Sequence, residues 1–121
     1  MIIGVPRETG QGERRVALVP DSISRLKGVE VRIEQGAGDA AGYADASYRN
    51  QGASIVPTSA LLYQADLILK VQPPSETEAG FFREGSAVVS FLYPFTNLSI
   101  VRKLASRGMT ELVAAITKLG A

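Results

Sequence analysis

The chain has 121 residues, of which 45% are hydrophobic and 21% are charged, with a net charge of +1. This size and composition predict one globular domain over residues 1–121, with no bulk attraction to nucleic acid. The absence of cysteine and histidine excludes disulfides, cysteine nucleophiles, Ser-His-Asp triads and nearly all common zinc sites. No signal peptide or apolar segment of ~20 residues is present, so we expect a soluble, cytoplasmic chain with no direct membrane insertion.

Short β-branched runs alternate with segments of helical character along the chain. In chain order, the predicted strands are Ile2–Val5, Val29–Glu34, Ala53–Val56, Asp66–Val71 and Ser86–Leu92. Capping residues and glycine stops predict a helix that begins after Pro20, with Asp21 or Ser22 as its N-cap, and closes at Gly28. Further helices are predicted from Asp45 to Gly52, from Thr58 or Ser59 to Tyr63, from Ser75 to Phe82 and from Leu98 to Ser106. This alternation predicts an α/β fold with a mostly parallel sheet of five or six strands and helices on both faces. Such a three-layer arrangement is Rossmann-like or flavodoxin-like.

Two cationic side chains follow the predicted strands at their carboxyl ends. Pro6 stops the first strand, and the polar loop after it carries Arg15, whose planar fork suits a carboxylate or phosphate. Lys70 ends the apolar strand Leu67–Leu69. Ligands of open α/β sheets bind at this edge, so we expect Arg15 and Lys70 to share one crevice there. The alternative is that Lys70 leaves the sheet and is solvated.

The remaining polar groups predict little chemistry of their own. Glu8 and Glu13 flank the arginine loop, and we expect them to orient Arg15 by pairing. The glycines at positions 10 and 12, and those of Gly36–Gly38, do not complete a Gly-x-Gly-x-x-Gly fingerprint between a strand and a helix. No acidic group has the spacing of a known metal-binding loop. We therefore assign no metal site and no cofactor-binding residue.

Four blocks of sequence are informative together, because they follow one another without a large gap. They are Gly4–Thr9 running into Glu13–Pro20, then Glu34–Gly38, Tyr43–Tyr48 and Ala65–Pro74. Together they resemble the amino-terminal domain of the alanine dehydrogenase and nicotinamide nucleotide transhydrogenase family, over about residues 1–108. The resemblance implies that Arg15 clamps a substrate carboxylate and that Lys70 binds the substrate's carbonyl or carboxylate group. These two are the candidate substrate-binding residues.

Tyr93 departs from the dehydrogenases of this family. They carry a histidine at the position of Tyr93, where it serves as acid and base in converting a keto acid to an amino acid. A phenol titrates near ~10, which does not suit a proton donor at neutral pH, so we assign no catalytic residue. The block Phe91–Pro94, followed by Asn97, looks more like the α chains of transhydrogenases.

The carboxyl end also departs from the family pattern. Family members continue beyond residues 105–110 with another strand and a long helical segment leading into a second, dinucleotide-binding domain. Here Glu111–Leu119 predicts a short amphipathic helix before Gly120, so we expect residues 109–121 to diverge and the second domain to be lacking. We expect the helix to fold back on the sheet or to form a homodimer contact.

The resemblance therefore implies the amino-terminal domain of a transhydrogenase α chain. The complete enzyme transfers hydride between NAD(H) and NADP(H), coupled to proton translocation, and holds NAD(H) chiefly through the second domain. This chain alone is expected to bind no cofactor and to be inactive. The implied partners are other transhydrogenase domains or subunits, which would place it at the periphery of the inner membrane. The alternatives are a fragment of an alanine dehydrogenase-like enzyme and a non-catalytic binding or assembly module.

Overall fold

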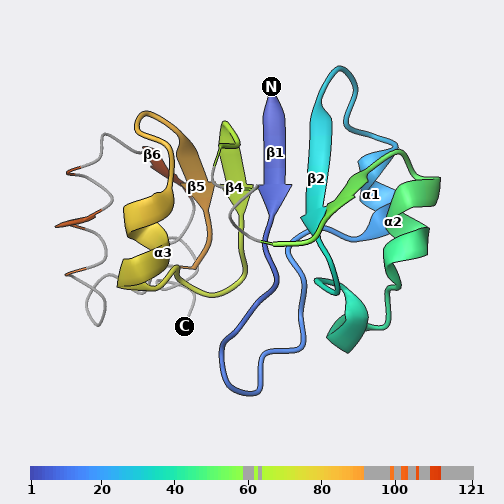
Figure 1. The fold of residues 1–121 in the computed structure, drawn as a ribbon, viewed down its shortest axis with the longest axis horizontal. Coiled ribbons are helices and arrows are strands. Elements are labelled where there is room, and N and C mark those ends of the chain that lie inside the picture. The colour runs from blue at the N-terminus through green and yellow to red at the C-terminus, as the bar shows by residue number, and fades with distance from the viewer. Residues whose placement is uncertain are drawn as a thin grey trace.

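The computed structural model describes residues 1–58, 62, 64–91, 99, 102–103, 106 and, for the backbone alone, 110–112. Six strands form one sheet in the order β3-β2-β1-β4-β5-β6, and every neighbouring pair is parallel (Figure 1). The strands are β1 (Ile2–Val5), β2 (Glu30–Glu34), β3 (Ser54–Val56), β4 (Leu67–Leu69), β5 (Ala87–Val89) and β6 (Thr110–Leu112). The predicted parallel α/β fold is confirmed.

The described helices are short. They are α1 (Pro20–Ile23), the 3₁₀ turn η1 (Asp39–Ala41), α2 (Asp45–Asn50) and α3 (Glu76–Phe81). Helix α3 begins with a capping box, in which the Ser75 hydroxyl accepts the Glu78 N–H and the Glu78 carboxylate accepts the Ser75 N–H. The predicted helices over 58–63 and 98–106 lie mostly outside the described residues.

The direction of the crossovers puts helices on both faces of the sheet. From β1, the chain moves through α1 to β2 and through α2 to β3, whereas from β4 it moves through α3 to β5 on the opposite side of β1. Right-handed crossovers in opposite directions place their helices on opposite faces. The α1–α2 face buries a cluster of the inward residues of β1 and β2 with Ile23 and Tyr48.

The other face depends on a glycine in the central strand. Gly4 is in register with Ile68, which is in turn in register with Val88. A Cβ atom on Gly4 would lie 3.2 Å from Ala65 Cβ and 3.3 Å from Leu62 Cβ, closer than ordinary packing. The absence of a side chain therefore lets the segment before β4 pack directly onto β1.

The carboxyl end differs from its prediction at the residues that can be compared. Thr110–Leu112 form strand β6, parallel to β5, where Glu111 and Leu112 were expected to begin a helix. The helical spacing of apolar residues was misleading because pairing with β5 satisfies the backbone of this short segment. Residues 113–121 lie outside the described part of the chain.

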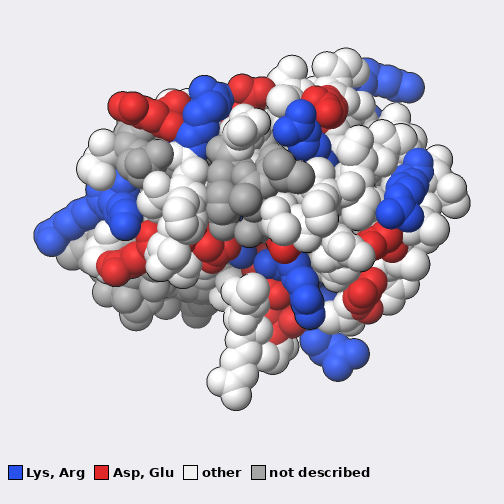
Figure 2. Space-filling model, viewed as in Figure 1, with Lys and Arg blue, Asp and Glu red and all other residues white. Residues whose placement is uncertain are grey.

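Acidic and basic side chains are interspersed on the molecular face that Figure 2 presents, in keeping with the small net charge. Within the described residues, no helix is long and apolar enough to cross a membrane.

Candidate functional site

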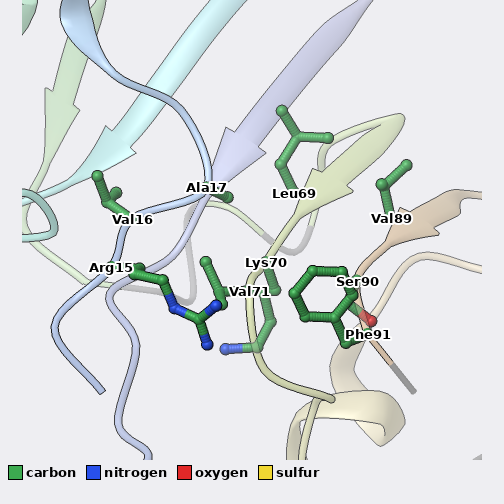
Figure 3. A pocket seen from close by; sticks show the side chains of 9 residues that line it. All are labelled: Arg15, Val16, Ala17, Leu69, Lys70, Val71, Val89, Ser90 and Phe91. Atoms are coloured by element: carbon green, nitrogen blue, oxygen red, sulfur yellow. The ribbon is translucent and has the colours of Figure 1, made fainter. Parts of the chain in front are cut away.

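A cavity of about 360 Å³ opens where the chain leaves β4 and β5, beside the loop that follows β1. Strands β2 and β4 flank β1 on its two sides, so the connections diverge here and leave a crevice at the carboxyl edge. The lining residues, shown in Figure 3, are Arg15, Val16, Ala17, Leu69, Lys70, Val71, Val89, Ser90 and Phe91. The walls are mostly apolar, and the two candidate cations both lie on them.

Arg15 reaches the cavity from the loop after β1 (Figure 3). Its guanidinium is held by both oxygens of Glu13, with Nε and Nη2 each 2.9 Å from a carboxylate oxygen. Its Cζ atom lies over the Phe91 ring, 6.0 Å from the ring centroid. The side chain keeps 61% of its surface exposed, so the guanidinium forms the solvent-facing rim of the cavity.

Lys70 lies on the inner side of the cavity and is almost wholly buried. Its side chain is 2% exposed, and its ammonium lies 3.2 Å from the Glu8 carboxylate and 3.7 Å from that of Glu78. The alternative of a solvated lysine is therefore wrong. Burial of a cation requires such partners, because an unpaired charge away from water is costly.

Glu8 does more than pair with Lys70. Its two oxygens also accept the backbone N–H groups of Val71, at 2.8 Å, and Gln72, at 3.1 Å. Glu8 was expected to orient Arg15, and that expectation is wrong, because its carboxylate turns to the end of β4 instead. The expectation for Glu13 is confirmed.

Glu13 has a lowered pKa because of the groups that surround it. The hydrogen bond from Arg15, followed by that from the Gln72 amide, lowers the pKa of its carboxyl from 4.5 to about 2. The Gln72 bond is short, with 2.6 Å between Nε2 and the carboxylate. Glu13 is therefore ionised throughout the physiological pH range and holds Arg15 as a charge-assisted pair.

A hydrogen bond from helix α2 also restrains the loop that carries Arg15. The Tyr48 hydroxyl of α2 donates a hydrogen bond of 2.8 Å to the Leu18 carbonyl, three residues after Arg15. Burial raises the pKa of Tyr48 to about 12. The Tyr48 ring in turn packs on Gly38, whose position would bring a Cβ within 2.8 Å of the ring. The glycines of Gly36–Gly38 thus form a turn and allow the close contact with the Tyr48 ring.

The number of carboxylates around the two cations of the site was not predicted from the sequence. Three carboxylates surround the two cations, because Glu78 of α3 joins Glu8 and Glu13. Neither Glu78 nor Gln72 was singled out as a site residue from the sequence. The predicted helix from Ser75 places Glu78 in its first turn, but nothing in the sequence places it beside Lys70.

Tyr93 and the metal site remain to be compared with the structure. Tyr93, at the position where the resembling dehydrogenases carry histidine, lies outside the described residues. Among the described residues, no group of three or more acidic side chains is arranged to hold a metal ion. The polar part of the site is therefore described by the cluster of Glu8, Glu13, Arg15, Lys70 and Glu78, which we call the ion-pair cluster.

Comparison with known proteins places this site in a family context. Residues 4–116 match the family model described as alanine dehydrogenase/PNT, N-terminal domain. The chain is 39% identical over 113 residues to the NAD(P) transhydrogenase subunit alpha of Cereibacter sphaeroides, covering 91% of this chain and 22% of that protein. It is 33% identical over 114 residues to the alanine dehydrogenase of Bacillus subtilis, covering 93% and 30%.

Solved structures agree with the sequence comparison. The transhydrogenase from Sinorhizobium meliloti superposes with a TM-score of 0.87 at 34% identity, covering 92% of this chain and 34% of that one. An L-alanine dehydrogenase superposes with a TM-score of 0.88 at 32% identity, covering 92% and 31%. The chain thus spans between a fifth and about a third of the length of these relatives. The family match also extends beyond residue 108, where the resemblance was expected to end, and the chain belongs to the alanine dehydrogenase/PNT N-terminal domain family.

Proposed function

We propose that this chain is the amino-terminal domain of an NAD(P) transhydrogenase α subunit. The complete enzyme would transfer hydride between NAD(H) and NADP(H), coupled to proton translocation. The observation that carries the proposal is the pairing of both cavity cations within the chain. A substrate carboxylate would meet Arg15 with one edge of its fork already held by Glu13, and Lys70 already held by two carboxylates.

In this proposal, the ion-pair cluster has a structural task. Glu8 joins the loop after β1 to the end of β4, and Glu78 joins α3 to the same lysine. The cluster would fix the edge of the domain that faces the remainder of the enzyme. The identity to the transhydrogenase subunit, 39% against 33% for an alanine dehydrogenase, supports the same choice.

The chain alone is proposed to lack hydride-transfer activity. Hydride transfer requires a nicotinamide held against its acceptor, and no residue set for holding one was identified in this sequence. NAD(H) would be bound by other parts of the enzyme. The partners would therefore be other transhydrogenase domains or subunits, through which this domain would lie at the periphery of the membrane.

A second candidate is an alanine dehydrogenase-like domain that binds a small carboxylate. It is favoured by the meeting of Arg15 and Lys70 at one cavity with apolar walls, which would suit a short keto acid. It is disfavoured by Tyr93, a poor replacement for a histidine that exchanges protons near neutral pH.

Two chimeric proteins distinguish these functions. In the first, residues 4–116 replace the matching segment of the Cereibacter sphaeroides transhydrogenase α subunit, which is assembled with its partner subunits and assayed for hydride transfer. In the second, the same residues replace the matching segment of the Bacillus subtilis alanine dehydrogenase, which is assayed for reductive amination of pyruvate. We expect the first chimera to be active and the second to lose about 100-fold or more of its rate, the contribution of a general acid or base.

A matched variant tests the reason for the second result. Tyr93→His in the alanine dehydrogenase chimera should restore part of the lost rate. The proposal is wrong if the dehydrogenase chimera with Tyr93 works well while the transhydrogenase chimera, folded and assembled, does not. If both folded chimeras are inactive, a non-catalytic module becomes the better description.

A further inference from the structure

Gln72 touches both halves of the ion-pair cluster, although it carries no charge. It follows β4 by three residues and is half-buried. Its backbone N–H donates to Glu8, at 3.1 Å, and its side-chain amide donates to Glu13, at 2.6 Å. Gln72 therefore bridges the carboxylate that holds Lys70 and the carboxylate that holds Arg15.

The bridge acts on the same oxygen atoms that hold the cations. Glu13 Oε1 accepts both the Gln72 amide, at 2.6 Å, and Arg15 Nη2, at 2.9 Å. Glu8 Oε1 accepts both the Gln72 backbone N–H, at 3.1 Å, and Lys70 Nζ, at 3.2 Å. A displacement of Gln72 would consequently move the anchoring oxygen of each cation.

The chemistry of an amide suits this position better than that of a charged group. A cation at position 72 would compete with Arg15 for Glu13, and a carboxylate would face Glu13 as a like charge. A neutral donor adds a hydrogen bond to the ionised carboxylate and leaves the pairing with Arg15 intact. The side chain also packs against Gly10, with Gln72 Cγ 3.5 Å from the position of a Cβ there, so the arginine loop restrains it.

We propose that Gln72 is a positioning residue that sets where Arg15 and Lys70 lie relative to each other at the cavity. Its side chain acts through Glu13 on Arg15, and its backbone acts through Glu8 on Lys70. The inference concerns the groups that place the cations, so it holds whether the domain serves a transhydrogenase or an amino-acid dehydrogenase.

The test is Gln72→Met, which keeps the length of the side chain and the backbone N–H but removes the amide donor. By NMR of the full chain, we expect the pKa of Glu13 to rise from about 2 toward 4.5. We also expect the Arg15 Nη2 protons, whose acceptor Glu13 Oε1 is shared with the Gln72 amide, to exchange with water about tenfold faster once that amide no longer holds the oxygen in place. The Lys70 and Glu8 signals serve as an internal reference and should change little, because the backbone donor remains.

Gln11→Met is the matched control, because it makes the same change at an exposed position of the loop that carries Arg15. It should leave the pKa of Glu13 and the Arg15 exchange rate unaltered. Unchanged values of both in folded Gln72→Met would overturn the inference, as would an equal change in the Gln11→Met control.

Two further measurements keep the test decisive if Gln72→Met does not fold. Gln72→Asn retains an amide but is one methylene too short to reach Glu13 at 2.6 Å, so it should reproduce the faster Arg15 exchange. In the unmodified chain, the Gln72 amide protons should show a nuclear Overhauser effect to the Glu13 side chain. The absence of that effect at neutral pH would contradict the bridge itself.

Discussion

Removal of the Glu8 carboxylate should destabilise the domain more than any exposed charge change. In Glu8→Ala, the Lys70 ammonium would remain buried, with its side chain 2% exposed and only Glu78, at 3.7 Å, still in reach among the described groups. Breaking a buried ion pair on one side costs about 3–5 kcal/mol. The N–H groups of Val71 and Gln72 also lose their acceptor, but water can reach this half-buried edge, so we do not add their full cost.

The free energy of unfolding should be measured by urea denaturation followed by far-ultraviolet circular dichroism. Lys70→Met should also be destabilising, and the double variant should lose less than the sum of the two single losses, because it leaves no buried charge without its partner. Glu84→Ala, at an exposed position, is the control and should lie within about 0.5 kcal/mol of the unmodified chain. A loss below about 1 kcal/mol for Glu8→Ala, or strict additivity in the double variant, would refute the reasoning.

Two more predictions concern the support of the arginine loop. Gly38→Ala would place a Cβ 2.7 Å from the Tyr43 carbonyl oxygen, and we expect it to cost about 1–3 kcal/mol, as overpacking does. Thermal unfolding should show this loss, whereas Gly10→Ala, with its nearest neighbour at 3.5 Å, should show little. Tyr48 should make stability fall as pH rises from 10 to 12, because the unfolded chain loses the phenolic proton near 10 and the folded chain only near 12. Denaturation across that range should show a smaller fall for Tyr48→Phe, and equal slopes for the two proteins would contradict this assignment.

The sequence predicted the parts of the fold that depend on local patterns. Strand β1 covers the predicted Ile2–Val5, and helix α3 begins at the predicted cap, Ser75. Arg15 and its partner Glu13 are two residues apart, so their pairing could also be expected from the loop alone. The gathering of Arg15 and Lys70 at one edge followed from the parallel topology, although their part in binding a substrate stays a prediction.

Features that depend on contacts between distant parts of the chain could not be predicted from local sequence patterns. Lys70 pairs with Glu8, which lies 62 residues earlier in the chain. Whether Glu8 pairs with Lys70 or with Arg15 depends on how two connections cross at the sheet edge. Helix α1 ends at Ile23, before the predicted stop at Gly28, because the helical pattern does not indicate how many turns the packing retains. The helical spacing at Glu111 and Leu112 likewise gave way to pairing with β5.

The position of β1 in the sheet has a consequence for how the chain folds as it is made. Of the six strands, β1 comes first in the chain and is a central one, and it pairs with β2 on one side and with β4 on the other. The β1–β2–β3 half can therefore assemble once residue 56 has emerged, and it then serves as the template on which β4 and β5 are added. Deletion of Ile2–Val5 would remove the shared partner of both halves. Strand β1 thus matters more to the whole sheet than either of its edge strands.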